Sequence, residues 1–340
     1  MPLDSQLDWK SLGFQFLPTN GHVQCDFVDG EWGPLEVKRD PYLSMHVAAN
    51  CLHYGQAAFE GLKAFTTKSG DIVLFRPDKN AERLQLSADR ILMEAPSTDL
   101  FIKACKLAVT ANREFVPPYG TGASLYLRPL LIGTEPTVGI KPSSTYSFIV
   151  LVTPVGPYYK DGFHPVDALV MEEYDRAAPK GTGRAKMAGN YAASLKPGHE
   201  AKKKGYPIVL FSDPKEGRYV DEFGTSNFIG ITPKGEFKTP LSSSILESIT
   251  NLSLQVLAAE MGLKVSCEPI LLSSLDQFKE VGACGTAAVI TPIYSVQYGE
   301  KKFTFGEKGI AGEMLTKLYK GLQAIQYGEV ADTHHWLVKI

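Results

Sequence analysis

The sequence lacks an excess of basic charge. Its 340 residues hold 35 Lys and Arg against 37 Asp and Glu, a formal net charge of -2. A nucleic-acid-binding protein needs a basic surplus or a clustered basic face. One short basic run, Lys202-Lys203-Lys204 before Gly205, is typical of a solvated helix end. We therefore expect no nucleic-acid partner.

Long apolar runs and paired cysteines are also missing. Apolar runs such as residues 148–152 are too short to cross a bilayer. The first ten residues carry acids and no basic region followed by an apolar stretch, so neither a secretory signal nor a mitochondrial leader is expected. The cysteines are odd in number and form no C-x-x-C pair, which favours a reducing compartment. They are Cys25, Cys51, Cys105, Cys267 and Cys284. We expect a cytoplasmic protein that does not enter a membrane.

The chain is long enough for two hydrophobic cores, and 44% of its residues are hydrophobic. No internal repeat or low-complexity segment interrupts it. Composition changes abruptly at TPVGPYYKDGFHP, residues 153–165. We predict a small N-terminal domain over 1–157, an interdomain loop over 158–170 and a large domain over 171–340.

Residue patterns predict strands and helices in both halves, and therefore an α+β fold. Pro197 lies inside one helical pattern and is expected to kink or break it. The predicted strands are 71–76, 123–128, 145–153, 166–172, 207–211, 218–222 and 226–232. Two helices are predicted in the first half, around residues 84–92 and 100–111. Three more are predicted in the second half, at 189–204, 249–261 and 311–325.

The segment GTGRAKMAGNY, residues 181–191, surrounds Lys186 with small residues. Small residues let a large group approach the backbone closely, and a desolvated lysine loses its proton readily and can form an imine. A flexible turn with a solvated lysine is the plain alternative. Neither the P-loop spacing nor the dinucleotide fingerprint G-x-G-x-x-G occurs here.

A second segment, YVDEFGTSNFIGIT at 219–232, places Glu222 at a strand end before a small polar turn. A carboxylate beside a pyridine nitrogen would keep that nitrogen protonated, so that the ring can accept electrons. The turn could also offer N–H groups to an anion. A hairpin turn with an exposed glutamate explains this segment equally well by itself.

Together these segments resemble the lysine and glutamate segments of fold-type IV pyridoxal-phosphate (PLP) enzymes. Four further segments narrow the resemblance to the branched-chain amino acid aminotransferases. These are CLHYGQAAFEGLKAF (51–65), SLYLRPLLIGTEPTVG (124–139), TPVGPYY (153–159) and IQYGEVADTHHW (325–336). They follow one another in the family's order along almost the whole chain.

The resemblance implies a two-domain α+β fold with a smaller N-terminal domain, a larger C-terminal domain with a β-barrel-like core, and PLP at the domain interface. Lys186 would form the internal aldimine and move the proton between substrate and cofactor. Glu222 would pair with the pyridine nitrogen. Tyr191 would lie near the ring oxygen of the cofactor. The phosphate would be bound by Arg83, Ile249, Thr250 and Thr286.

The resemblance also implies an aromatic substrate pocket that suits a branched aliphatic side chain. Arg128, two residues after Tyr126 in a strand, would share its face and accommodate the side-chain carboxylate of glutamate. The main-chain N–H groups of Thr225, Ala287 and Ala288 would bind the substrate carboxylate. The implied substrate-binding residues are Phe14, Tyr54, Phe59, Tyr126, Arg128, Tyr158, Thr225, Ala287 and Ala288. No metal site is expected.

The sequence departs from the family pattern in three segments. Ile229 stands where an aromatic residue usually follows the Asn227-Phe228 pair. The usual Gly-Ile-Thr-Arg of the phosphate helix reads Ser248-Ile249-Thr250-Asn251, which leaves the detail of the phosphate site open. Ala288 and Thr291 replace the redox C-x-x-C pair of some animal members, so no thiol switch of that kind is expected.

The implied reaction is ping-pong transfer of the amino group of L-leucine, L-isoleucine or L-valine to 2-oxoglutarate through the Lys186 aldimine. A homodimer is implied, as is a place in branched-chain amino-acid biosynthesis. The preferred amino acid stays open, because one methylene discriminates by only about 1–3 kcal/mol. The direction stays open because transamination is near-reversible and depends on metabolite levels. The alternatives are a D-amino-acid aminotransferase, an aminodeoxychorismate lyase, a non-catalytic PLP-binding protein and, more distantly, a nucleotide enzyme.

Overall fold

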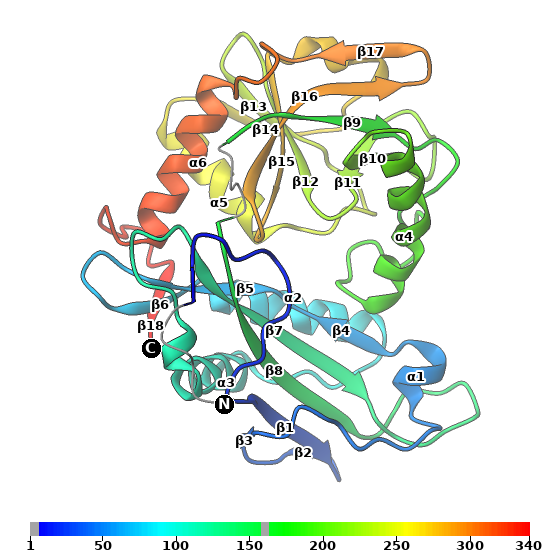
Figure 1. Cartoon of the computed structure of the whole chain (residues 1–340). Coiled ribbons are helices and arrows are strands. Elements are labelled where there is room, and N and C mark those ends of the chain that lie inside the picture. The colour runs from blue at the N-terminus through cyan, green and yellow to red at the C-terminus, as the bar shows by residue number, and fades with distance from the viewer. Residues whose placement is uncertain (1–6, 158–162) are drawn as a thin grey trace. The chain divides into compact units, whose positions relative to one another are not determined.

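The computed structural model describes residues 7–157 and 163–340, which divide into two compact units (Figure 1). The first contains Met1–Lys160, Ala185–Ala188 and Ala324–Ile340, and the second contains Asp161–Arg184 and Gly189–Gln323. Helices and sheets occur in both, so the predicted α+β fold class is confirmed. The segments 185–188 and 324–340 lie in the first unit, whereas the predicted division put them in the large domain. The first unit is therefore not the smaller of the two.

The first unit is built on a nine-stranded sheet with the order β18-β6-β5-β7-β8-β1-β2, in which β3 pairs with β1 and β4 with β7. The long central pair β7–β8 is antiparallel from end to end. Its strands are β1 (His22–Val28), β2 (Glu31–Trp32), β3 (Glu36–Lys38), β4 (Ala57–Phe59), β5 (Leu62–Thr66), β6 (Ile72–Phe75), β7 (Ser124–Gly133), β8 (Tyr146–Val155) and β18 (Leu337–Lys339).

Two helices, α2 (Pro77–Arg90) and α3 (Thr98–Ala111), pack on this sheet. The expected apolar face of α2 is buried at Leu84 and Ala88, whereas Leu92 lies beyond the end of the helix and is exposed. Leu84 of α2 and Phe101 of α3 are fully buried in one cluster with Leu125 and Leu127 of β7. Ser97 caps α3 by accepting a hydrogen bond from the N–H of Leu100. The short α1 (Asn50–Tyr54) and η1 (Arg113–Phe115) complete the unit.

The second unit contains another nine-stranded sheet, with the order β11-β10-β9-β16-β15-β12-β13-β14 and β17 paired to β16. Its strands are β9 (Val166–Val170), β10 (Ile208–Ser212), β11 (Val220–Phe223), β12 (Asn227–Ile231), β13 (Glu236–Thr239), β14 (Lys264–Cys267), β15 (Glu280–Gly285), β16 (Val289–Tyr298) and β17 (Lys301–Thr304). Its helices are α4 (Ala188–Lys203), α5 (Ile249–Glu260), α6 (Glu313–Gln326) and η2 (Leu272–Gln277). The first residue of α4 and the last three residues of α6 belong to the first unit.

Two predicted features differ in the structure. Pro197 does not break α4, which continues through it. The proline ring is buried, which favours its place in the helix, although a proline cannot donate the backbone hydrogen bond. The predicted interdomain loop, 158–170, ends in the strand β9, while its residues 158–162 lie outside the described residues.

The end of the chain returns to the sheet of the first unit. β18 pairs antiparallel with β6, and Trp336 packs edge-on against Phe75 with the Arg76 guanidinium 5.0 Å from its ring centre. Trp336 is 8% exposed. The C-terminal strand thus covers an edge of the sheet that would otherwise present unpaired backbone groups.

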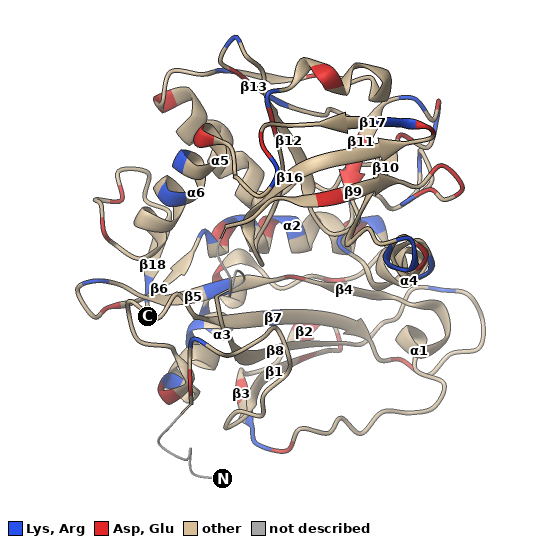
Figure 2. Ribbon diagram, turned by 45° about the horizontal axis from the view of Figure 1, so that its top comes forward, with Lys and Arg blue, Asp and Glu red and all other residues tan. Residues whose placement is uncertain are grey.

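Basic and acidic residues are interspersed within each unit (Figure 2). Within residues 7–157 and 163–340, no helix combines the length and apolarity that a membrane crossing requires.

Candidate active site

The backbone of Lys186 is fixed by two elements of the first unit. Its N–H donates to Ser87 Oγ at 2.8 Å, and its carbonyl accepts from the N–H of Phe59 at 3.0 Å. Ala58 and Met187 form an antiparallel bridge. The lysine segment therefore runs alongside β4 and the last turns of α2, although it is far from both in sequence.

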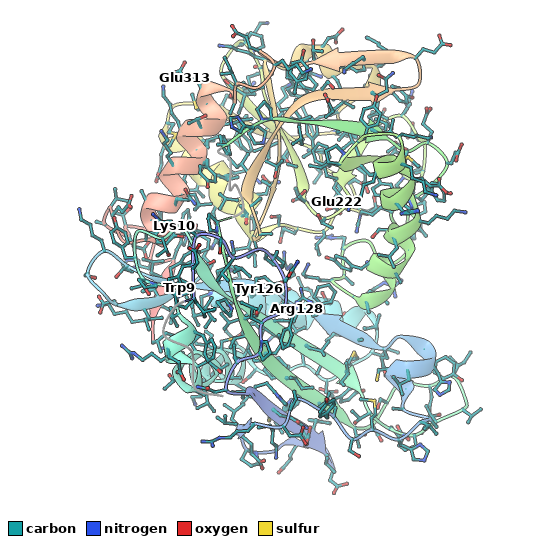
Figure 3. All side chains as sticks on the ribbon, viewed as in Figure 1. Trp9, Lys10, Tyr126, Arg128, Glu222 and Glu313 are labelled. Carbon is teal, nitrogen blue, oxygen red and sulfur yellow. The ribbon has the colours of Figure 1, made fainter. Side chains whose placement is uncertain are left out.

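An aromatic and cationic cluster lies around the Lys186 side chain. The lysine Nζ is 4.7 Å from the centre of the Phe59 ring, and the Arg128 guanidinium is 4.9 Å from that centre. Arg128 donates to the Tyr126 hydroxyl from Nε at 3.3 Å and from Nη2 at 3.0 Å (Figure 3). Phe14 packs edge-on against Tyr126, with 5.0 Å between ring centres. Four of the predicted substrate residues are therefore together.

Strand geometry explains this grouping. Tyr126 and Arg128 are two residues apart in β7 and share a face, and Phe59 of β4 pairs with Leu130 on that same face. A Cβ at Gly61 would lie 2.2 Å from the Tyr126 hydroxyl oxygen, so a larger residue there would displace the Tyr126 ring. The Tyr126 hydroxyl thus occupies the space that a side chain at position 61 would need.

Tyr54, another predicted substrate residue, has its hydrogen bond elsewhere in the first unit. Tyr54 ends α1, is 41% exposed, and donates from its hydroxyl to the Val138 carbonyl. None of the cluster interactions includes it. Tyr158 lies outside the described residues.

Arg83, the predicted phosphate ligand, forms a two-point ion pair with the fully buried Glu60. Nε and Nη2 of the arginine donate to the two carboxylate oxygens at 2.8 and 2.7 Å. Asn80 donates to the same carboxylate at 2.8 Å. The guanidinium is therefore held in one orientation by a partner that the sequence did not indicate.

In the second unit, Glu222 of β11 is buried and closely surrounded. Its Oε1 accepts from the N–H of Leu246 at 2.9 Å and lies 2.8 Å from Nε of Arg176. Its Oε2 accepts from Asn227 Nδ2 at 3.0 Å. A carboxylate oxygen can accept two hydrogen bonds, so Oε2 retains acceptor capacity for one more donor.

Charge and burial oppose one another at this carboxylate. Burial raises the pKa of Glu222 to about 7, while the Arg176 guanidinium favours the ionised form. Burial also raises the pKa of the neighbouring Asp221, whose Oδ1 accepts from Ser244 Oγ at 2.7 Å. Arg176 donates to the carbonyls of Gly183 and Ser244, and so joins the segment before the lysine to the glutamate strand.

The first turn of α5 lies next to Glu222. Ser248 caps this helix by accepting from the N–H of Asn251 at 3.2 Å, and its own N–H donates to Asn227 Oδ1 at 3.3 Å. The first residues of a helix have N–H groups without intrahelical partners, and their dipoles favour anions. Ile249 and Thr250 are the first two residues of α5, as the phosphate prediction requires.

The remaining predicted residues of the second unit lie in two turns and in α4. Asn227 pairs with Cys284 in the antiparallel β12–β15 ladder, so the turn that contains Thr225 and the turn 286–288 flank the same end of this strand pair. That end holds Thr286, Ala287 and Ala288. Tyr191 is half-buried in the first turns of α4.

Known proteins resemble this chain along its whole length. The family description "Amino-transferase class IV" matches residues 57–296. Branched-chain-amino-acid aminotransferases from Haemophilus influenzae and Helicobacter pylori are both 44% identical, covering 98% and 100% of this chain and 99% and 100% of their own. A solved structure of the Escherichia coli branched-chain amino acid aminotransferase superposes with a TM-score of 0.80 at 29% identity, covering 94% of this chain and 98% of that chain.

The chain belongs to the branched-chain amino acid aminotransferase family of class IV. It is a transaminase, and the cofactor of this class is PLP. The buried carboxylate of Glu222 has an oxygen able to accept from a pyridinium N–H, and Ile249 and Thr250 at the start of α5 have N–H groups with no acceptor inside the helix. These two features suit the two ends of that cofactor.

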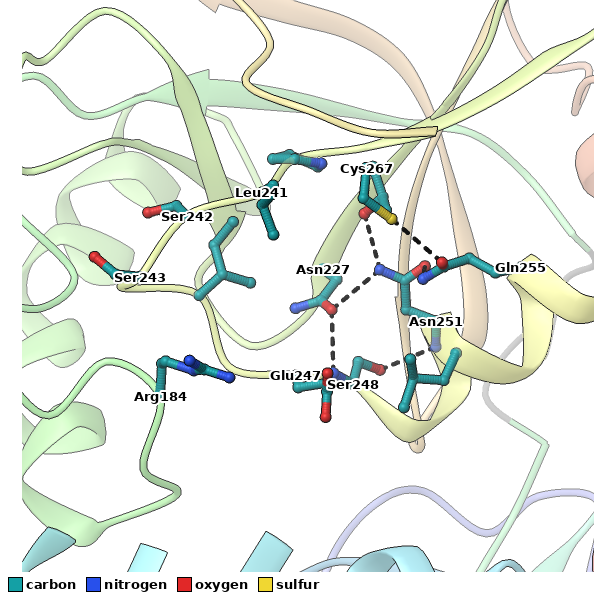
Figure 4. A pocket seen from close by; sticks show the side chains of 14 residues that line it. Arg184, Asn227, Leu241, Ser242, Ser243, Glu247, Ser248, Asn251, Gln255 and Cys267 are labelled. Atoms are coloured by element: carbon teal, nitrogen blue, oxygen red, sulfur yellow. Dashed lines mark hydrogen bonds between the residues drawn. The ribbon is translucent and has the colours of Figure 1, made fainter. Parts of the chain in front are cut away.

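The second unit of this aminotransferase also contains a cavity of about 410 Å³, lined in part by Arg184, Leu241, Glu247, Asn251 and Gln255 (Figure 4). Its lining includes none of the predicted cofactor residues Glu222, Ile249 and Thr250. In the described part of the chain, no group of three or more His, Cys, Asp and Glu side chains is placed to hold a metal ion.

Sequence reasoning missed four residues that hold the site together: Ser87, Glu60, Arg176 and Asn227. Each acts through a contact with a residue far along the chain or through a buried charge. The burial of Glu60, which makes a charged partner necessary, is visible only in the structure. Nothing in the local sequence around Arg176 indicates that it faces Glu222.

Proposed function

We propose that this aminotransferase transfers the amino group of L-leucine, L-isoleucine or L-valine to 2-oxoglutarate, giving branched-chain 2-oxo acids and L-glutamate. The cluster around Lys186 carries the proposal. Phe59 and Tyr126 offer apolar ring surface to an aliphatic side chain, and Arg128 beside them offers a cation to the carboxylate of the acidic partner. One face of the sheet thus suits both kinds of substrate.

Lys186 is the proposed catalytic residue. Its amine would hold PLP covalently and, when freed, would act as the base and acid that moves the proton at the substrate α-carbon. PLP, when bound, supplies a protonated ring that delocalises the carbanion. The cation–aromatic contact with Phe59 places the amine against a ring that excludes water from one side.

Glu222 would hold the pyridine nitrogen protonated, and Arg176 would keep Glu222 ionised despite its burial. The N–H groups of Ile249 and Thr250 would bind the phosphate, with Thr286 and Arg83 as further ligands. Tyr191, Thr225, Ala287 and Ala288 retain the roles predicted from the sequence.

A homodimer in the cytoplasm is also proposed. Exposed apolar side chains gather in the loops of the first unit, where Tyr42, Val47, Val138 and Ile140 are at least 80% exposed. Such side chains favour burial against another surface. The five cysteines are free, as suits a reducing compartment. Sedimentation velocity of the holoprotein tests the assembly, and a monomer at micromolar concentration would contradict it.

The visible spectrum of the PLP-loaded protein tests the substrate assignment. We expect L-leucine to bleach the lysine-bound cofactor band and 2-oxoglutarate to restore it. The Lys186→Ala variant should lose all turnover while keeping its fold, and Lys204→Ala, which removes an exposed lysine, should behave like the wild type. A band that ignores L-leucine but responds to D-alanine would favour a D-amino-acid aminotransferase instead.

A further inference from the structure

The side-chain amide of Asn227 uses all four of its hydrogen-bonding positions. Its Nδ2 donates to Glu222 Oε2 at 3.0 Å and to the Leu246 carbonyl at 2.9 Å. Its Oδ1 accepts from the N–H of Ser248 and from Asn251 Nδ2, both at 3.3 Å. Asn227 is 4% exposed. One buried amide therefore contacts the glutamate on one side and the start of α5 on the other.

Asn251 fixes the second side of this connection. Its Nδ2 also donates to Thr239 Oγ1 at 2.8 Å, and Thr239 donates in turn to the carbonyl of Phe228 in β12 (Figure 4 shows the bonds around Asn251). The backbone N–H of Asn251 is the group capped by Ser248. Asn251 is thus tied both to the first turn of its own helix and to the strand that begins with Asn227.

We propose that Asn251 is a positioning residue which, through Asn227, couples Glu222 to the first turn of α5, so that occupation of one end of the PLP site strengthens binding at the other. The inference rests on the proposed cofactor roles of Glu222 and of the α5 N-terminus. It assigns a purpose to Asn251, one of the positions where this chain departs from the pattern of its family.

The physical reason is the shared oxygen of Asn227. Its two donors, Ser248 and Asn251, both belong to the start of α5, so an anion that orders this turn also orders the amide. The ordered amide then holds Oε2 of Glu222 in the direction needed by a ring nitrogen. Buried networks of this kind act as a unit, because a partner left unpaired away from water is costly.

The two ends of the cofactor can be supplied separately, as pyridoxal and inorganic phosphate. Pyridoxal binding to the apoprotein is followed by the absorbance of its lysine adduct, with and without saturating phosphate. In the wild type we expect phosphate to tighten pyridoxal binding at least about fivefold, the lower range of typical coupling between sites.

Asn251→Ala should reduce this coupling to less than about twofold. Asn251→Leu keeps the side-chain volume without the donor and should do the same, which guards against a misfolded alanine variant. Gln255→Ala is the matched control, because Gln255 lies one turn further along α5, lines the same cavity and has a bond to Asn251 but none to Asn227. It should keep wild-type coupling.

Wild-type coupling in a folded Asn251→Leu protein, or no coupling in the wild type, would overturn the inference while leaving the proposed function intact. If pyridoxal and PLP both fail to give an adduct that depends on Lys186, the proposed function fails and the inference falls with it. Equal loss of coupling in Gln255→Ala would also count against it, because the effect would then belong to α5 in general.

Discussion

At the scale of single residues, this aminotransferase buries several acidic side chains around its candidate site, away from the screening of water. Glu222, Glu60 and Asp221 are all buried, and the first two are matched by an arginine at 2.8 and 2.7 Å. Burial penalises an ionised carboxyl, and a nearby guanidinium offsets that penalty. The ionisation of these acids therefore depends on particular partners.

The raised pKa of Glu222 makes the stability of the apoprotein depend on pH. A folded pKa of about 7 against a usual 4.5 means that the folded state holds this proton more tightly. Stability from this group is fully present below pH 4.5 and is lost as the pH rises to about 7. The wild type should therefore lose on the order of 3 kcal/mol relative to Glu222→Gln across that window. Urea unfolding of both apoproteins at several pH values measures this, and a constant difference would contradict it.

Arg128 should distinguish the two substrates. Replacing it with Met removes a charge-assisted partner for the side-chain carboxylate of 2-oxoglutarate, an interaction worth about 1.5–3 kcal/mol. We expect the KM for 2-oxoglutarate to rise about 10- to 100-fold and that for L-leucine to change much less. Single half-reactions followed by stopped-flow absorbance measure both, with the exposed Arg113→Met as control. Equal effects on the two substrates would assign Arg128 a purely structural role.

At the scale of elements, the segment before the lysine is shaped by close backbone approach. A Cβ on Gly183 would lie 2.1 Å from the Ser244 carbonyl oxygen, the atom to which Arg176 also donates. The small residues of GTGRAK thus admit a neighbouring loop of the protein itself. The sequence predicted that a large group approaches the backbone of this segment closely, but it did not indicate which group.

Gly183→Ala should therefore disturb the loop 242–248 and, through it, Glu222. We expect a loss of about 2 kcal/mol or more of unfolding free energy, in the range of strained or overpacked positions, together with weaker PLP binding. Gly198→Ala in α4 is the matched control, because its Cβ would meet open space and alanine favours a helix. It should be neutral or slightly stabilising. Thermal unfolding and cofactor titration provide both comparisons.

Much of the fold could be predicted because periodicity is local. The apolar faces that include Leu84 and Leu100 lie on α2 and α3, and each strand predicted around residues 71–76, 123–128 and 145–153 is present. The roles of Glu222 and Arg128 were predicted from the family resemblance. The structure adds that Glu222 is buried and that Arg128 has aromatic neighbours. Arg176 and Ser87 could not be predicted, because pairing between distant segments leaves no local pattern. Pro197 was expected to kink or break its helix, and α4 is not broken there. Burial of the proline ring cannot be deduced from the sequence alone.

At the scale of the whole molecule, the C-terminal strand is part of the first unit's sheet. Trp336 contacts Phe75 and Arg76, and β18 covers the edge of β6. Trp336→Ala should lower the unfolding free energy by about 3–5 kcal/mol, as expected for a buried tryptophan. Val330→Ala, at a position 51% exposed, should change it by less than about 0.5 kcal/mol. Urea unfolding measures both, and similar values for the two variants would mean that the tail is not part of the cooperative core.

The two units are interleaved along the chain. The first takes its residues from three separate stretches, one of them the four residues Ala185–Ala188 around the lysine. No single cut of the gene can therefore yield two fragments that each encode one unit. A chimaera that exchanged the N-terminal 160 residues with a relative would keep its own lysine segment and its own C-terminal strand against a foreign sheet. Recombination at that point would have to preserve the fit of β4 to Met187 and of β6 to β18, so homologous exchange should tolerate this crossover only between close relatives.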